Sequence, residues 1–329
     1  MPLRSMILCD SGLVSHEHHN HRPGAGADRR WLLAALVVVL AFMVAEVVAG
    51  VLAHSLALIT DAGHMITDAA AIGVAIVAVR IAQRPARGAY TYGFARVDAL
   101  SGQANGITLV LLAIWFGVVG VSRLISPGAV HGGVVSVVAA VGVGVNLLAT
   151  WLAGRADRAG LNVRGVLAHL ITDVWAFVAT FAAGLIIMWT GWTRADAIAS
   201  LLVAALMAWT GWALIRAAGR VFLEAAPTDI DPFELGERLA AVQGVAELHD
   251  LHVWQLGGAE RAMSAHVLVN APHDCHEVST RLRAVLAESY GIGHVTLQAD
   301  HADAADRPGG HDAGHCVDAH GEVHVARKG

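Results

Sequence analysis

Lysine is almost absent from this chain of 329 residues, and charged residues of every kind are scarce. The only lysine is Lys328, so a Walker A phosphate loop, which needs a lysine after its glycines, is excluded and ATP is not an expected fuel. Charged residues make up 15% of the chain, against about a quarter in soluble domains, whereas 56% are hydrophobic. This composition indicates a protein that crosses a membrane several times and is surrounded by lipid.

Cysteine is also rare. Cys9, Cys275 and Cys316 are odd in number and show no C-x-x-C spacing, so neither a disulfide framework nor a cysteine-based zinc finger is expected. The formal net charge of -5 argues weakly against nucleic acid as a partner.

Long apolar runs dominate the first two thirds of the chain. About 20 apolar residues are needed to cross roughly 30 Å of hydrocarbon. Runs of that kind lie near 31–50, 56–79, 97–121, 133–153, 164–189 and 195–215. We therefore expect an all-α bundle of six transmembrane helices over residues 31–218, preceded by a cytosolic, histidine-containing tail at 1–30.

Arginine is concentrated in alternate connections between these runs. It occurs before the first run, after the second and after the fourth, whereas the intervening loops hold only Arg123 and Arg194, or none. The positive-inside rule then predicts that both termini are cytoplasmic. The bias toward alanine, glycine and arginine over lysine suggests a bacterial genome rich in G and C, and hence the inner membrane.

The sequence pattern changes after Pro227. A helix is predicted to open at Asp231, followed by a strand over 245–256, a second over 261–269, a helix over 275–290 and a third strand over 294–299. Residues 227–300 are therefore expected to form a small cytosolic α+β domain. Residues 301–329 are polar and rich in histidine, and we expect a disordered tail that is either a weak metal buffer or simply solvated.

A five-residue motif occurs twice within the apolar runs. HMITD spans His64 to Asp68 in the second run, and HLITD spans His169 to Asp173 in the fifth. An ionisable residue at the centre of a membrane helix costs roughly 2.5 to 3.5 kcal/mol on insertion scales, so four of them indicate a function. Positions i and i+4 share one helix face, so each copy presents an imidazole beside a carboxylate.

Two such helices facing each other would complete a four-coordinate metal site. His64, Asp68, His169 and Asp173 offer two nitrogens and two oxygens, a set that Zn²⁺ accepts. Without a thiolate the set favours Zn²⁺, tolerates Co²⁺, Fe²⁺, Mn²⁺ or Cd²⁺, and disfavours Cu⁺. The alternative is that these side chains only hydrogen-bond helices together, but that role needs one donor and one acceptor and leaves two matched copies unexplained.

These features predict a secondary transporter of divalent metal ions rather than an enzyme. Histidine changes charge between about pH 5 and 8, so a His/Asp site couples Zn²⁺ binding to proton release. An intramembrane zinc hydrolase would need an open coordination position and a general base, and HEHHN lacks the second histidine of a metalloprotease motif because Asn20 stands there. A metal sensor that uses the soluble domain and the tails stays an open alternative.

Several segments together resemble the zinc branch of the cation diffusion facilitator family. They are Glu46, SLALITDAGHMITD at 55–68, YTYGFARVDAL at 90–100, HLITD at 169–173, RADAIASLL from Arg194 and HDLHVWQL at 249–256. The resemblance covers nearly the whole chain. It implies a homodimeric metal/proton antiporter with six transmembrane helices and an αββαβ, metallochaperone-like cytosolic domain, which exports Zn²⁺ from the cytoplasm and contributes to metal homeostasis and resistance.

The resemblance also implies site residues. It gives the transport site to the four residues that the repeat had already selected. It further implies a cytosolic metal site at His249, His266 and Asp300, while the alternative remains that His249 and His252 only make structural hydrogen bonds. In the loop after the second run Tyr90 stands where some relatives have a histidine, so no metal site is expected there.

Overall fold

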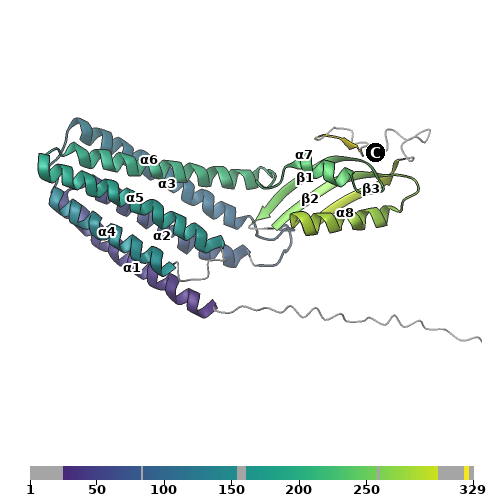
Figure 1. Cartoon of the computed structure of the whole chain (residues 1–329), viewed down its shortest axis with the longest axis horizontal. Coiled ribbons are helices and arrows are strands. Elements are labelled where there is room, and N and C mark those ends of the chain that lie inside the picture. Colours follow the sequence, from purple (N-terminus) through teal and green to yellow (C-terminus); the bar gives the residue numbers. More distant parts are fainter. Residues whose placement is uncertain (1–24, 83, 154–160, 258–259, 303–321, 326–329) are drawn as a thin grey trace, which may run out of the picture.

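The computed structural model describes residues 25–82, 84–153, 161–257, 260–302 and 322–325. An elongated helical bundle and a smaller α+β domain lie end to end (Figure 1). The bundle consists of α1 (Ala25–Ala53), α2 (Leu56–Ala82), α3 (Val97–Ile125), α4 (Gly132–Ala153), α5 (Leu161–Thr190) and α6 (Arg194–Phe222). Each predicted apolar run falls within one of these helices.

Four segments in the described part of the bundle are long and apolar enough to cross a membrane. They are Val97–Ile125, Gly132–Leu152, Asp173–Thr190 and Arg194–Phe222, whereas the described apolar part of α1, Val37–Ala53, is shorter. Large apolar side chains such as Trp115, Trp209 and Leu111 are more than half exposed. Their exposure is the pattern expected of a bundle whose outer surface faces lipid rather than water.

The helices pack most closely as two pairs, α3 with α6 and α4 with α5. Gly106 of α3 and Gly211 of α6 face each other, so that a Cβ atom on either would come within 2.8 Å of the other's carbonyl oxygen. A Cβ at Gly132 of α4 would likewise lie 2.8 Å from the carbonyl oxygen of Gly184 in α5. Small residues therefore allow close backbone approach, as in other membrane helix pairs.

The C-terminal domain contains α7 (Pro232–Ala240), β1 (Val245–Gly257), β2 (Glu260–Val269), α8 (Cys275–Tyr290), β3 (His294–His301) and β4 (His324–Val325). The sheet order is β3-β2-β1-β4. Strand β2 is antiparallel to β1 and parallel to β3. The first five elements confirm the predicted α+β domain and its αββαβ order.

Local sequence explains where the two helices of this domain begin and end. Asp231 and Asp274 precede α7 and α8, and each carboxylate accepts hydrogen bonds from two amides of the first turn. These are N-caps, which satisfy amides that the helix cannot. Gly291 ends α8 in a left-handed conformation with φ of 63°, the usual C-terminal signal.

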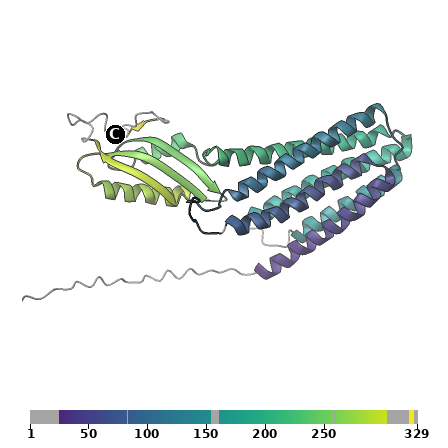
Figure 2. The same cartoon turned by 180° about the vertical axis from the view of Figure 1, so that it is seen from behind.

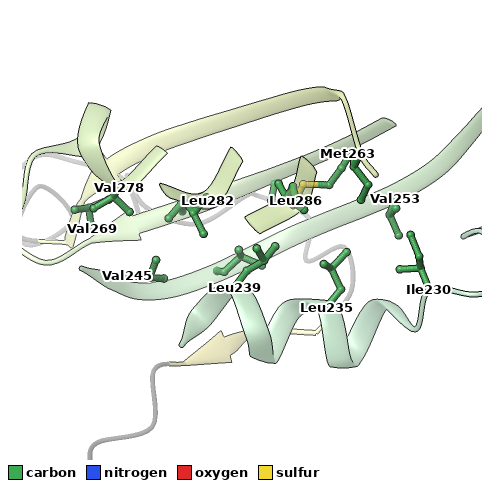
Figure 3. Packing of buried hydrophobic residues seen from close by; sticks show 14 residues of the cluster. Ile230, Leu235, Leu239, Val245, Val253, Met263, Val269, Val278, Leu282 and Leu286 are labelled. Carbon is green, nitrogen blue, oxygen red and sulfur yellow. The ribbon is translucent and has the colours of Figure 1, made fainter. Parts of the chain in front are cut away.

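One face of the sheet packs against both helices. Figure 3 shows Leu235 and Leu239 of α7 and Leu282 of α8 directed toward strand residues such as Val253 and Met263. All five side chains are buried. Alternate strand residues, among them His249 and His266, therefore belong to the opposite face of the sheet.

The tail departs from its sequence prediction at one place. His324 and Val325 form β4, which pairs antiparallel with Leu248 and Glu247 at the edge of β1. The His324 side chain is buried, and its ring lies 5.4 Å from that of Phe233. The prediction of a disordered tail over 301–329 is therefore wrong at His324 and Val325. Residues 303–321 and 326–329 lie outside the described part of the chain.

The two domains meet through the loop between α2 and α3 and the end of α6. Figure 2 shows this loop beside the sheet. Arg96, at the start of α3, donates to Glu224, after α6, over 2.6 Å. The Tyr92 and His294 rings lie 5.6 Å apart, and a Cβ at Gly257 would come 2.2 Å from the Ala95 carbonyl oxygen. The C-terminal domain thus contacts the loop that connects α2, the helix that carries His64, to α3.

Candidate metal site

One side chain from each copy of the repeated motif meets the other inside the bundle. Nε2 of His64, on α2, lies 3.9 Å from Oδ1 of Asp173, on α5. The two residues are 3% and 8% exposed, so this contact is shielded from solvent. Two ligands of one tetrahedral zinc are about 3.3 Å apart, so a small movement would allow both atoms to bind one ion.

The other two predicted ligands lie on the same helices. The backbone is helical at Asp68 and at His169. Asp68 follows His64 by four residues and His169 precedes Asp173 by four, so each shares a helix face with its neighbour in the motif. Their side chains lie outside the described part of the structure, and their convergence with His64 and Asp173 stays a prediction.

Two further acidic residues are buried in the bundle and belong to the same electrostatic group as Asp173. Glu46, on α1, has no exposed surface, and Asp61, one turn before His64 on α2, is 2% exposed. The charges of Asp61 and Asp173 both act on Glu46. The site therefore draws ionisable groups from three helices, α1, α2 and α5.

Sequence analysis had not selected Glu46 as a site residue. It is a lone glutamate in an apolar run and has no repeated partner, so nothing in the sequence places it beside the motif. Two signals pointed to Glu46: the energetic cost of placing a glutamate in a membrane helix, and its presence among the residues that carry the family resemblance.

The charge balance of this cluster defines its chemistry. Glu46, Asp61 and Asp173 are buried carboxyl groups, and burying ionised carboxylates without compensation is costly. A divalent cation or bound protons would offset that charge, and each would compete with the other. A nearby imidazole, at His64, adds a nitrogen that binds either a metal ion or a proton.

Asp196 has a structural role at the end of the bundle. Its carboxylate accepts hydrogen bonds from the amide of Leu56, at 2.6 Å, and from the Ser55 hydroxyl, both at the beginning of α2. Thr60 and Ser200 form a second polar contact of 2.7 Å between α2 and α6. These bonds fix the start of the helix that carries His64.

The C-terminal domain also brings two predicted ligands together. His249 of β1 and His266 of β2 are register partners, with ring centroids 5.5 Å apart. Nδ1 of His249 lies 3.1 Å from a carboxylate oxygen of Glu247. Asp300 belongs to the same face of the sheet but accepts a hydrogen bond from Gln298. The two histidines are adjacent, and Asp300 does not join them in a three-residue cluster.

A bulge in β1 sets the direction of these histidines. Asp250 has φ of 52°, and the β1–β2 register shifts between His249 and His252. The extra residue places His249 and His252 on the same face of the sheet. Nε2 of His252 lies 3.0 Å from the Asp250 carboxylate, which agrees with a structural role for His252.

Cys275 begins α8 and is a poor candidate ligand. Its sulfur lies 3.4 Å from Nε2 of His301. Partial burial and the negative charges of Asp274 and Asp300 raise the pKa of the thiol above its usual value, which disfavours the metal-binding thiolate. Within the described ranges, no group of three or more His, Cys, Asp or Glu side chains is placed to hold a metal ion.

Two family models and a full-length relative match this chain. Residues 32–223 match the family model for the cation efflux transmembrane domain, and residues 227–302 match that for the cation efflux protein cytoplasmic domain. The chain is 35% identical to the zinc transporter ZitB of Pectobacterium atrosepticum over 312 residues, 94% of this chain and 96% of that protein.

Two further relatives carry broader metal names. The metal cation efflux system protein CzcD of Cupriavidus metallidurans is 34% identical over 88% of this chain and 92% of its own length. The cadmium, cobalt and zinc/H(+)-K(+) antiporter of Bacillus velezensis is 31% identical over 86% of this chain and 92% of its own length. Both alignments span the bundle and the C-terminal domain together.

Proposed function

The chain belongs to the cation efflux family, and from that premise we propose that it exports Zn²⁺ from the cytoplasm in exchange for protons. It is a membrane transporter of metal cations rather than an enzyme. The observation that carries the proposal is the buried contact between His64 and Asp173, because it joins the two copies of the repeated motif.

In this proposal one Zn²⁺ binds at a His₂Asp₂ site formed by His64, Asp68, His169 and Asp173. The imidazole nitrogens and carboxylate oxygens complete a tetrahedral set, and the carboxylates offset the charge of the cation. The site opens first to the cytoplasm and then to the other side. Cd²⁺ and Co²⁺ are further substrates, since the same ligands accept them.

Proton exchange follows from ligand competition. A zinc-binding imidazole must be deprotonated, so Zn²⁺ binding releases protons and proton binding favours Zn²⁺ release. The carboxylates Glu46 and Asp61 supply nearby negative charge that cations and protons share. A pH difference across the membrane would then drive the ion in one direction.

The proposal also covers membrane topology, oligomeric state and regulation. We propose six membrane crossings in the inner membrane of a bacterium, with both termini in the cytoplasm because arginine is concentrated in the connections on that side. The C-terminal domain pairs with a second copy to form a homodimer, and His249 and His266 bind regulatory metal on the sheet face opposite α7 and α8; Asp300 would join them only after leaving its hydrogen bond with Gln298.

Zinc flux into proteoliposomes tests the proposal. With an imposed pH difference, the full chain should move Zn²⁺ against its gradient, and Asp173→Ala should abolish this flux while the protein still inserts. Asp98→Ala is the matched control, because Asp98 is an exposed carboxylate at the start of α3.

Two outcomes would contradict the proposal. Full flux in Asp173→Ala would show that Asp173 does not bind the transported ion. Flux that does not depend on the pH difference would show that Zn²⁺ is not exchanged for protons. Zinc binding without any flux would favour the sensor instead.

A further inference from the structure

Two histidines lie together at the end of the bundle that is farthest from the C-terminal domain. His54 occupies the corner between α1 and α2, and His131 directly precedes α4. Figure 1 shows these helix ends at the tip of the bundle, opposite the sheet. Neither residue belongs to the repeated motif or to the sites described above.

Main-chain contacts fix the distance between these two residues. The His131 amide donates to the Ala53 carbonyl over 3.1 Å, so the α3–α4 loop is tied to the residue before His54. His54 itself has φ of 54°, a left-handed conformation that few residues other than glycine adopt. Its carbonyl accepts a hydrogen bond of 2.7 Å from Arg123. The Cα positions of the pair are therefore held by hydrogen bonds to the main chain of both loops.

The imidazole rings are placed to share an ion. Their centroids are 6.5 Å apart and their planes are inclined by 36°. Two imidazoles on one tetrahedral zinc have ring centres about 5 Å apart, given Zn–N bonds of about 2 Å. Both side chains are exposed, so no burial in the core opposes the side-chain rotation that sharing an ion would need.

The charge environment predicts weak and reversible binding. The pair supplies two neutral nitrogen ligands, and water would complete the coordination. Arg123 is close to His54 and disfavours a cation, although the charge of Arg123 also acts on buried Asp196. A site with two ligands and a nearby guanidinium would release its ion readily.

We propose that His54 and His131 form a second, low-affinity site for a divalent cation of the zinc class at the end of the bundle farthest from the C-terminal domain. Its role as an exit station for ions that leave His64 rests on the proposed function; the binding itself does not. His64 lies ten residues beyond His54 in the chain, which corresponds to roughly 15 Å along a helix.

Residue-resolved chemical modification tests this site in the full chain. Diethyl pyrocarbonate would be applied to the protein in lipid nanodiscs at neutral pH, with ZnCl₂ or MgCl₂, and each histidine followed by peptide mass spectrometry. At zinc ten times the dissociation constant, modification of His54 and His131 should fall about tenfold together. Mg²⁺ should protect neither, because it prefers oxygen ligands.

Variants separate a shared site from two independent histidines. His54→Asn keeps a residue that tolerates the left-handed backbone but removes the imidazole. In this variant, and reciprocally in His131→Ala, the remaining histidine should lose its zinc protection. His252→Asn, which removes an exposed histidine of the C-terminal domain, should leave both protected. Zinc protection that persists at His131 in His54→Asn would overturn the shared site, as would no protection in the unaltered protein.

The same measurement in Asp173→Ala distinguishes this inference from the proposed function. Protection at His54 and His131 should survive in that variant, because the pair has its own ligands. Loss of protection there would show that the two histidines do not bind a cation by themselves, and would overturn the inference whatever the flux experiment gives.

Discussion

The bundle and the C-terminal domain each bring a histidine of the sequence prediction against another candidate ligand, but in different surroundings. In the bundle, His64 meets Asp173 between two helices, with Glu46 and Asp61 buried nearby. On the sheet, His249 meets His266 across two paired strands and contacts Glu247. The first cluster has several carboxyl groups that need compensation, whereas the second is explained by strand pairing alone. The bundle cluster therefore needs a bound cation or protons to offset its buried carboxyl groups, whereas the sheet pair is stable without either.

The largest expected effect separates His64 from His249. His64→Ala should abolish zinc flux in proteoliposomes, because it removes a nitrogen ligand from a buried site that has few ligands. His249→Ala should leave most of the flux, because His249 and its neighbours His266 and Glu247 lie in the C-terminal domain, outside the bundle. Equal losses in the two variants would show that the sheet pair belongs to the transport pathway itself.

Glu46→Gln should have the next largest effect. The substitution keeps the size of the side chain but removes a negative charge that acts together with Asp61 and Asp173. A loss of only about 1.4 kcal/mol in cation stabilisation corresponds to a tenfold weaker affinity, which a zinc titration of the initial flux rate would detect. The matched control is Glu260→Gln, an exposed glutamate at the start of β2. An unchanged concentration dependence in Glu46→Gln would restrict the site to the repeated motif.

Leu282→Ala should destabilise the C-terminal domain and leave the bundle site unchanged. Leu282 is fully buried in the core between α8 and the sheet, and truncation of such a side chain costs about 2 to 5 kcal/mol. Amide hydrogen exchange in the full chain should accelerate in β1, β2 and β3. Leu282→Met, which conserves volume, should cost less than about 1.5 kcal/mol. Faster exchange around His64 as well would mean that the two regions unfold together.

Asp274→Ala should have the smallest effect, and one that depends on pH. Hydrogen bonds from the amides of Glu277 and His276 lower the pKa of Asp274 below its ordinary value of 3.8. A lowered pKa stabilises the fold above that value, and this stabilisation disappears as the pH falls through the pKa of the folded state. Thermal unfolding at neutral pH should therefore show a slightly lower midpoint for the variant, and the difference should vanish in acid. A difference that grows in acid would contradict the capping role.

Much of this architecture could be predicted because it depends on local pattern. Each apolar run lies within one described helix, and four of these helices contain a segment long and apolar enough to cross a membrane; α1 and α6 extend furthest beyond their runs, because the helix continues into less apolar flanks. Caps and alternation set α7, α8 and the strands within a few residues. The contact between His64 and Asp173 was also anticipated, because a repeated motif on two helices suggested that the copies meet.

The remaining features depend on packing between distant segments. Glu46 reaches the site because α1 packs against α2, and no spacing in the sequence records that neighbour. Strand β4 is only two residues long and is stabilised by the free edge of β1 and by the surface of α7, near Phe233. The His54 and His131 pair likewise arises from a bond between two loops.

The most direct test of the central claim is a structure of the full chain with Zn²⁺ bound. The account predicts one ion between α2 and α5, within about 2.0 to 2.2 Å of a His64 nitrogen and an Asp173 oxygen, with Asp68 and His169 completing the coordination. Zinc density elsewhere in the bundle, with His64 and Asp173 too far apart to share an ion, would contradict it.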